Sequence, residues 1–164
     1  MDISHSINNG NVTGGAGTGG FVGFIYGDIN VTISIANSVN DGNVSGSGHS
    51  VGGFSGWVVY NAKMAMTISN CINNGFVHGD ERDAGGFFGY IGCYLDSDFI
   101  TLDIMNSVNR GNVSAKKDWA CGLACVVSKL KTTVKNSINK GSVNAGKDGY
   151  GITNNITVAR NVVS

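Results

Sequence analysis

Short runs in which apolar and polar residues alternate recur along the whole chain. The clearest are rich in Val, Ile and Thr. They read TISIANS (32–38), MTISNCI (66–72), TLDIMNS (101–107), TTVKNSI (132–138) and ITVARNV (156–162). Alternation with a period of two and an excess of β-branched residues are typical of strands, not of helices. The pattern therefore predicts an all-β chain.

The same order of residues returns after each run, which indicates an internal repeat. SVNDGNVSG (38–46) has counterparts in SINNGNVTG, CINNGFVHG, SVNRGNVSA and SINKGSVNA. Their shared glycines are 32, 33, 36 and 30 residues apart, at Gly10, Gly42, Gly75, Gly111 and Gly141. Periods of 20–50 residues are typical of solenoids, propellers and arrays. We therefore predict a single repeat domain, 1–164, with units near 3–34, 35–67, 68–103, 104–133 and 134–164.

Three apolar columns keep their place in every unit. The first contains Val12, Val44, Val77, Val113 and Val143. The second contains Phe21, Phe54, Phe87, Leu123 and Ile152, and the third contains Ile3, Ile35, Ile68, Ile104, Val134 and Val158. The Val-to-Phe distance is always 9 or 10 residues, whereas the stretch from Phe to the next Ile varies from 6 to 17. A fixed arc followed by a variable loop predicts a parallel β-solenoid, a three-sided β-helix of about five coils stacked about 4.8 Å apart.

Stacking of such coils would bring the N-x-G residues into register. The asparagines would then form a structural amide ladder in which each side chain bonds the next. This ladder is expected at Asn8, Asn40, Asn73, Asn109 and Asn139. We expect the following glycine to take a positive φ, so that the corner can turn without a Cβ clash. A column of small residues is expected at Ser6, Ser38, Cys71, Ser107 and Ser137.

The unit SVNDGNVSGSGHSVGGFSGWV (38–58) resembles the GLUG-type repeat of large surface and adhesin-like proteins, which is named for its Gly-Leu-any-Gly core. That repeat reads roughly S-x-N-x-G-x-V-x-G … V-G-G-L-V-G, and this chain has Phe where the family often has Leu. The resemblance covers residues 3–143 and fades after GKDGYGI (146–152). It implies a β-solenoid in an extracellular or cell-surface context, and it carries no catalytic residue to transfer.

Composition restricts the partners of the chain. It has 26 glycines, no proline and 13% charged residues, with a formal net charge of zero, so no overall field favours nucleic acid. No run of about 18 apolar residues exists, so we expect no membrane insertion. No signal peptide is recognisable in this chain, but Met1 falls inside a repeat, as it would in a fragment of a longer solenoid.

Charge is nevertheless divided along the chain. Residues 1–109 hold nine acids against two bases, and residues 110–164 hold nine bases against two acids. The chain also starts and stops at nearly the same phase of the repeat, so one copy could continue another. We therefore expect copies to associate head to tail, with exposed strand edges supplying most of the affinity and the charges supplying the orientation.

Two motifs that could carry chemistry have structural explanations. GAGTGG (15–20) fits the spacing of a dinucleotide-binding loop, but a strand, FVGFIYG, follows it where that loop needs a helix. Cys121 and Cys125 would lie about 13 Å apart on one predicted strand, which is too far for a disulfide. We therefore expect no cofactor, and buried free thiols that act as small apolar residues.

The remaining titratable residues do not converge on one site. The acids of 80–83 and 96–98 lie in predicted loops, where solvated charge is the simplest interpretation, although either group could bind a cation or serve as a pair of glycosidase carboxylates. The histidines occupy different phases of the repeat, at His5, His49 and His78. The sequence thus predicts no catalytic residue and no metal site.

Two features keep a role in glycan chemistry open. Sequons permit glycosylation of a secreted protein at Asn11, Asn30, Asn43, Asn112 and Asn155. Aromatic faces stack on sugars, and the candidates for outward projection are Tyr26, Trp57, Tyr60, Tyr94 and Trp119. The leading hypothesis is a non-enzymatic structural or interaction module, a segment of a surface or filament-forming protein. The alternative is a glycan-binding or adhesive module, and a polysaccharide-active enzyme is disfavoured because the acids are scattered.

Overall fold

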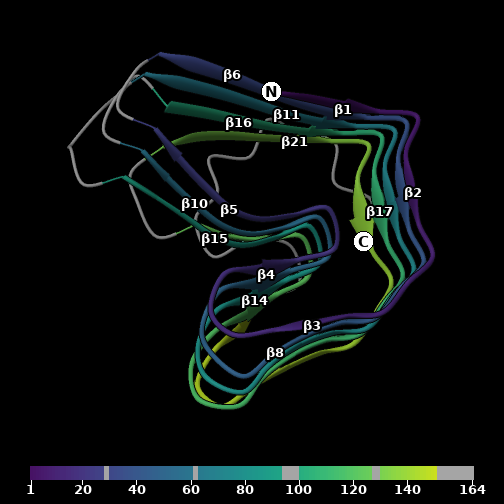
Figure 1. Ribbon diagram of the computed structural model, residues 1–164, viewed down its shortest axis with the longest axis vertical. Helices are drawn as coiled ribbons and strands as arrows, with labels where there is room; N and C mark the ends of the chain where they lie inside the picture. The colour runs from purple at the N-terminus through teal and green to yellow at the C-terminus, as the bar shows by residue number, and fades with distance from the viewer. Residues whose placement is uncertain (28–29, 61–62, 94–99, 127–129, 151–164) are drawn as a thin grey trace.

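The computed structural model describes residues 1–27, 30–60, 63–93, 100–126 and 130–150, which fold into a parallel β-solenoid (Figure 1). All the regular secondary structure in these ranges is β. The strands form five parallel sheets, here called A to E in chain order. Four complete coils run from β1 to β20, and β21 to β24 begin a fifth. The predicted parallel solenoid is confirmed.

Sheets A and E carry the longer strands. Sheet A contains β1 (Asp2–Ser4), β6 (Val31–Ala36), β11 (Met64–Ser69), β16 (Ile100–Met105) and β21 (Lys131–Lys135). Sheet E contains β5 (Val22–Gly27), β10 (Ser55–Tyr60), β15 (Phe88–Cys93) and β20 (Ala124–Val126).

Sheets B, C and D are built from strands of two or three residues. Sheet B contains β2 (Ile7–Asn8), β7 (Val39–Asn40), β12 (Ile72–Asn73), β17 (Val108–Asn109) and β22 (Ile138–Asn139). Sheet C contains β3 (Val12–Gly14), β8 (Val44–Gly46), β13 (Val77–Gly79), β18 (Val113–Ala115) and β23 (Val143–Ala145). Sheet D contains β4 (Thr18–Gly19), β9 (Val51–Gly52), β14 (Ala84–Gly85), β19 (Ala120–Cys121) and β24 (Gly149–Tyr150).

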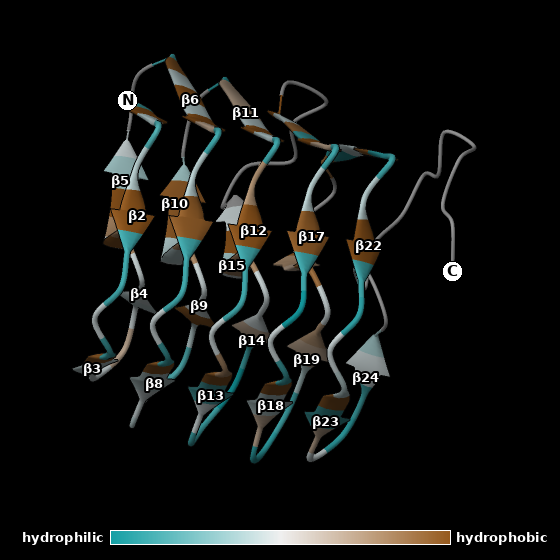
Figure 2. Ribbon diagram, turned by 90° about the vertical axis from the view of Figure 1, so that its right-hand side faces the viewer, coloured by the Kyte–Doolittle hydropathy of each residue, from teal (hydrophilic) through white to brown (hydrophobic). Residues whose placement is uncertain are grey.

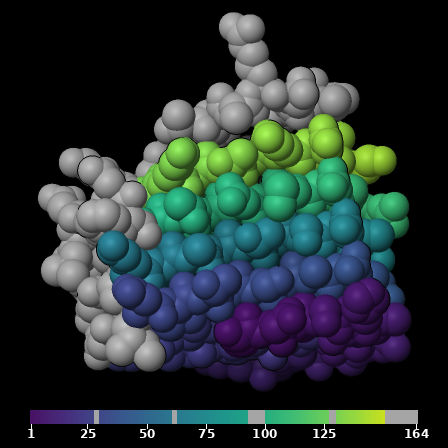
Figure 3. All heavy atoms as spheres, turned by 90° about the horizontal axis from the view of Figure 1, so that it is seen from above, coloured from purple at the N-terminus to yellow at the C-terminus, as the bar shows by residue number. Residues whose placement is uncertain are grey.

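Each coil therefore has five strands, not the three that the sequence predicts. The coils stack as successive layers (Figure 3), and each strand pairs in parallel with its equivalents in the adjacent coils. The segment taken as one strand around GGFVGFI is divided at Gly20 and Phe21 into β4 and β5. The Asn-Gly turn also contains its own strand in sheet B. Strands of two residues are too short to display alternation, which explains why the pattern did not reveal them.

The cross-section of the solenoid encloses two apolar clusters. The larger lies between sheets A and E and includes Ile35, Phe54 and Leu102. The smaller lies between sheets C and D and includes Val44 and Val51. Figure 1 shows sheet A opposite sheet E and sheet C opposite sheet D, with sheet B closing the remaining side. The chain folds because each coil contributes apolar residues to both clusters.

The predicted inward columns are confirmed within the described residues. The Ile column pairs in register from Ile3 to Val134, and the Val column from Val12 to Val143. In the Phe column the rings of Phe21 and Phe54 lie 5.0 Å apart between centroids, and the ring of Phe87 follows at 5.2 Å. The last members of two columns, Ile152 and Val158, lie outside the described residues.

The expected asparagine ladder is present along sheet B. In each step Nδ2 of one asparagine donates to Oδ1 of the next at 2.7 Å, through Asn8, Asn40, Asn73, Asn109 and Asn139. From Asn40 onward, Nδ2 also donates to the carbonyl of the glycine two residues later, at 2.7–2.9 Å. The asparagines point inward, and the Ile or Val before each one points outward. Figure 2 shows the strands of sheet B side by side, each passing from a hydrophobic to a hydrophilic residue. The three central amides are fully buried.

The N-x-G glycine is required for close packing and not for a positive φ, so that expectation is wrong. The described glycine with a positive φ is Gly17, which lies in another corner. A Cβ added to Gly75 would lie 1.9 Å from the carbonyl oxygen of Gly42 in the coil before it. Of the seven described residues other than glycine with a left-handed backbone, two stand before sheet D, at Ser50 and Asp83, and five stand between sheets A and B, at His5, Asn37, Asn70, Asn106 and Asn136. Asparagine tolerates that conformation better than most residues, which explains this second asparagine column.

We predict that Asn73→Ala destabilises the protein by about 1–3 kcal/mol, because it removes one of the two acceptors of the buried Asn40 Nδ2 and leaves the buried Oδ1 of Asn109 without its donor. Asn74→Ala is the matched control, since Asn74 lies next in the chain but is exposed. Urea unfolding followed by circular dichroism measures both. Equal midpoints for the two variants would show that the ladder contributes nothing to stability.

We predict that Gly75→Ala costs about 3 kcal/mol or more, because its Cβ cannot be accommodated without separating two coils. Gly15→Ala is the control, since a Cβ there meets no atom within 4 Å. Thermal unfolding of the two variants tests the difference. A Gly75→Ala protein as stable as Gly15→Ala would contradict the close approach of the coils.

Candidate functional site

Cys121 and Cys125 form a disulfide, so the expectation of free thiols here is wrong. β19 ends at Cys121, and the chain bends at Gly122 and Leu123 before β20 begins, so the two cysteines lie on adjacent sheets. Their Cα atoms are 5.4 Å apart instead of the about 13 Å expected for one extended strand. Cys121 is in register with Gly85, so the disulfide occurs where an earlier coil has glycine.

Cys71 is a buried free thiol in the serine column, as expected. Its Sγ lies 3.2 Å from the carbonyl oxygen of Ser69, and its backbone N–H donates to Ser107 Oγ at 3.1 Å. Burial raises the pKa of this thiol, which keeps it protonated and unreactive at neutral pH. Among the described residues, no three His, Cys, Asp or Glu side chains gather closely enough to hold a metal ion.

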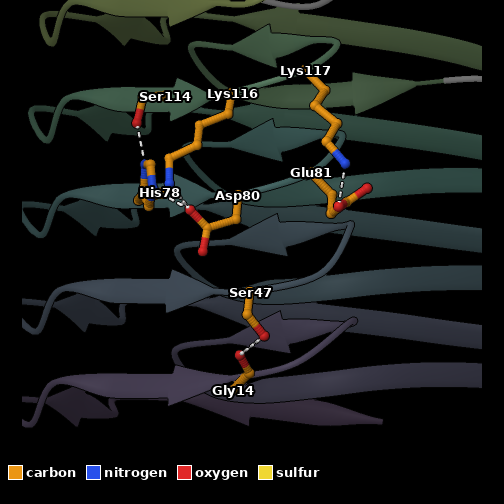
Figure 4. Close-up of polar contacts among 8 residues, drawn as sticks. All are labelled: Gly14, Ser47, His78, Asp80, Glu81, Ser114, Lys116 and Lys117. Atoms are coloured by element: carbon orange, nitrogen blue, oxygen red, sulfur yellow. Dashed lines mark hydrogen bonds and ion pairs between the residues drawn. The ribbon is translucent and has the colours of Figure 1, made fainter.

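Two of the acids of 80–83 form ion pairs with bases of the next coil (Figure 4). Asp80 contacts Lys116, and Glu81 contacts Lys117. His78 lies between two partners, with Nδ1 2.6 Å from Ser114 Oγ and Nε2 3.2 Å from Asp80 Oδ1. Hydrogen bonds from Lys116 and His78 hold the pKa of Asp80 below its usual value. This group is therefore a network of surface ion pairs between coils 3 and 4.

Asp118 continues this network one coil further. It accepts from Nε of Arg82 at 2.9 Å and from Nζ of Lys147 at 3.5 Å. The acidic and basic parts of the sequence thus meet inside one chain. The other acidic group, at 96–98, lies outside the described residues.

The histidines lie apart, as their phases predict. His5 is at the corner between sheets A and B beside Asn37, His49 packs against the ring of Trp57, and His78 lies on β13. GAGTGG (15–20) contains β4, and β5 follows it, so this segment has the strand expected after it.

The aromatic residues divide between the core and the surface. Tyr60 is 1% exposed and packs in the larger cluster, so it is not among the candidates that project outward. Its ring covers Gly27, where a Cβ would lie 2.5 Å from it. Tyr26 is 53% exposed, and Trp57 and Trp119 are half-buried. Tyr94 lies outside the described residues.

Two aromatic residues that the sequence analysis missed lie beside Trp57. Register places Phe24 and Tyr90 directly on either side of it on the outer face of sheet E. The ring of Trp57 meets those of Phe24 and Tyr90 edge to face, with centroids 5.2 and 5.9 Å apart, and that of His49 at 4.8 Å. The signal was available, because GGFVGF, GGFSGW and GGFFGY each end on an aromatic residue.

This aromatic column borders a cavity of about 280 Å³, here called the Trp57 cavity. Its lining comes from the corner before sheet D and from the outer face of sheet E in coils 2 and 3. The lining residues are His49, Ser50, Trp57, Arg82, Asp83 and Tyr90. The cavity thus combines aromatic walls with a carboxylate and a guanidinium.

Asp83 is the unusual residue of the Trp57 cavity. It is 3% exposed, has a left-handed backbone (φ 49°), and its Oδ1 is buried without a hydrogen-bond partner. Burial raises the pKa of its carboxyl to about 6, against the opposing effect of the Arg82 charge. Nε1 of Trp57 is likewise buried without a partner. One cavity therefore contains an unmatched acceptor and an unmatched donor.

Three sequon asparagines, each one residue before a strand of sheet C, have a structural role and are exposed. Oδ1 of Asn11 accepts the N–H of Asn43 at 3.0 Å, and Oδ1 of Asn112 accepts the N–H of Ser142 at 3.0 Å. Asn43 bonds the next coil in the same way, and Asn30 is exposed. Asn155 lies outside the described residues. Glycosylation of the five sequons stays a prediction.

Comparison with protein-family models, with curated proteins and with solved structures finds no match to this chain. The resemblance to the GLUG-type repeat therefore stays a prediction. In the described part of the chain, no helix has the length and apolar character needed to cross a membrane.

We predict that Asp83 makes the protein less stable at pH 7.5 than at pH 4.5. The pKa of its carboxyl rises from 3.8 to about 6 on folding, so within this window the folded state binds more protons and stability falls as pH rises. The full effect is about 3 kcal/mol, of which about 2 kcal/mol falls between pH 4.5 and 7.5. Asp83→Asn removes the charge and keeps a side chain that suits the left-handed backbone, so it should stabilise the protein by about 2 kcal/mol more at pH 7.5 than at pH 4.5.

Urea unfolding of both proteins at the two pH values measures this difference. The quantity compared is the difference in free energy of unfolding between the wild type and Asp83→Asn. Because the other carboxylates are common to both proteins, the change of this difference with pH reports Asp83 alone. A difference that is the same at pH 4.5 and 7.5 would contradict the raised pKa of Asp83.

Proposed function

We propose that this chain is a non-enzymatic structural and interaction module, a β-solenoid segment of a surface or filament-forming protein whose copies stack head to tail. The observation that carries the proposal is the repetition of one set of interactions at every coil boundary. A surface that fits one coil onto the next also fits a coil of another copy.

The asparagine ladder is polar and gives such stacking a direction. Oδ1 of Asn8 accepts the N–H of Gly10 in its own coil at 3.2 Å, and the later ladder amides each accept from the amide before them. At the other end Nδ2 of Asn139 donates to the Gly141 carbonyl. With an acceptor at one end and a donor at the other, the ladder favours stacking in which Nδ2 of Asn139 in one copy donates to Oδ1 of Asn8 in the next. Such a contact is heterologous and does not close, so it propagates.

Coil 1 also leaves a strand edge for a partner. β1 to β5 are each paired on one side only among the described strands. In this coil Ile3 and Phe21 are partly exposed, although the residues stacked on them, Ile35 and Phe54, are fully buried. Unpaired backbone groups next to apolar side chains are the features that favour pairing with another chain.

Charge contributes less to this contact than the sequence indicates. Lys116, Lys117 and Lys147 already pair with acids of neighbouring coils. The affinity is therefore assigned to the strand edge and the apolar columns, and we expect weak dependence on salt.

An extracellular or cell-surface location forms part of the proposal. The Cys121–Cys125 disulfide is of the kind that persists in oxidising compartments and is rare in the cytosol. The exposed sequon asparagines are compatible with secretion, and the resemblance to surface repeats implies the same context.

We predict a rise in apparent mass with concentration in sedimentation velocity, from monomer at low micromolar concentration to longer species at hundreds of micromolar. Ile3→Lys, at the open end of the apolar column, should hold the protein monomeric, because an edge lysine opposes strand pairing. Ile7→Lys is the matched control, since this residue is in the same coil but 63% exposed on sheet B's outer face.

Circular dichroism is used to check that both variants fold. A wild-type monomer at every concentration, in both low and high salt, would refute head-to-tail stacking. Equal loss of association in the two variants would assign the contact to the lateral face instead of the coil edge.

A further inference from the structure

The Trp57 cavity lies at a re-entrant corner of the solenoid. Figure 1 shows the chain reversing between sheets D and E, so that the outer faces of β4 and β5 approach each other. Glycines allow this approach, since a Cβ on Gly56 would lie 2.4 Å from the backbone of Gly17 and Thr18. Larger residues follow where the corner opens, and they line the cavity of about 280 Å³. Small-molecule sites occupy roughly 300–1,000 Å³, so the cavity suits a ligand of about one ring.

The walls of this cavity are partly aromatic. The ring of Trp57 packs edge to face against those of Phe24, Tyr90 and His49. Phe24 extends the same column toward the solvent and is 52% exposed. Such rings are suited to contact the C–H face of a sugar, because they offer a large apolar surface beside polar groups.

The polar groups distinguish between kinds of ligand. Oδ1 of Asp83 needs a donor, and Nε1 of Trp57 needs an acceptor. A hydroxyl group can donate and accept, whereas an ammonium ion only donates and a phosphate or carboxylate only accepts. The adjacent charges of Arg82 and Asp83 have opposite sign, so the lining carries no net charge that would select an ion.

We propose that the Trp57 cavity binds a neutral sugar, with one pyranose ring packed against Trp57 and Tyr90 and its hydroxyls bonded to Asp83 and to Nε1 of Trp57. Both polar atoms lie beneath the cavity wall, so the ligand reaches them through side-chain rotation, which is common at binding surfaces. The proposal rests on coils 2 and 3 and is independent of head-to-tail stacking.

Titration of the full chain with methyl glycosides of glucose, galactose, mannose and N-acetylglucosamine tests the proposal. Tryptophan fluorescence and saturation-transfer NMR report binding, and at least one glycoside should give a saturable change. Asp83→Asn should weaken its affinity at least tenfold, because charge-assisted hydrogen bonds are lost while the fold is kept. Trp57→Phe should weaken it similarly, since it removes Nε1 and part of the ring face.

Phe76→Asn is the matched control, because Phe76 is an exposed aromatic residue away from the cavity and asparagine stands at its position in coils 1, 2 and 4. The Phe76→Asn variant should bind the same glycoside with the affinity of the wild type. Absence of saturable binding for all four glycosides would overturn the proposal. So would unchanged affinity in both cavity variants, or tighter binding of methylammonium or acetate than of any sugar.

Discussion

The constraint on which the structure depends is the stacking of one coil on the next with every residue in register. The asparagine ladder expresses it most directly, because each buried amide is satisfied only when its equivalents lie directly before and after it. The same spacing makes the N-x-G glycines obligatory, since their neighbours' carbonyls occupy the space of a side chain. Thus polar satisfaction and steric exclusion select the same motif, and each coil acts as the template for the next.

Positions outside these columns vary between coils, and the disulfide and the Trp57 cavity lie at such positions. The corner before sheet D has Gly17, Ser50 and Asp83 in successive coils, although the strands after it keep their register. In coil 4 a disulfide joins sheets D and E at positions where earlier coils have glycine. The Trp57 cavity arises because a variable corner faces a column of variable aromatic residues across a fixed bend.

The sequence predicted the columns that repeat in every unit. It did not predict the contacts that depend on bends of the chain. The columns of Ile35, Val44 and Phe54 could be read because their spacing is constant in five units. The disulfide could not, because a break of two residues between β19 and β20 turns a distance along one strand into a contact between sheets. The core position of Tyr60 could not be predicted for a related reason: at the variable end of its strand, the sequence does not show which side faces the core. The Trp57 cavity combines residues from two coils, and only their register brings them together.

Stacking and sugar binding would reinforce each other in one module. The proposed contact between copies uses backbone edges and the ends of the apolar columns, whereas the proposed sugar site uses side chains of the middle coils. Head-to-tail growth continues the solenoid, so each added copy would present one further cavity along the filament, about 24 Å from the last for five coils at about 4.8 Å each. A weak site repeated along a rigid rod gains affinity for a polymeric ligand through effective concentration, without any new contact. The rigidity that the ladder imposes is then what allows neighbouring sites to act together.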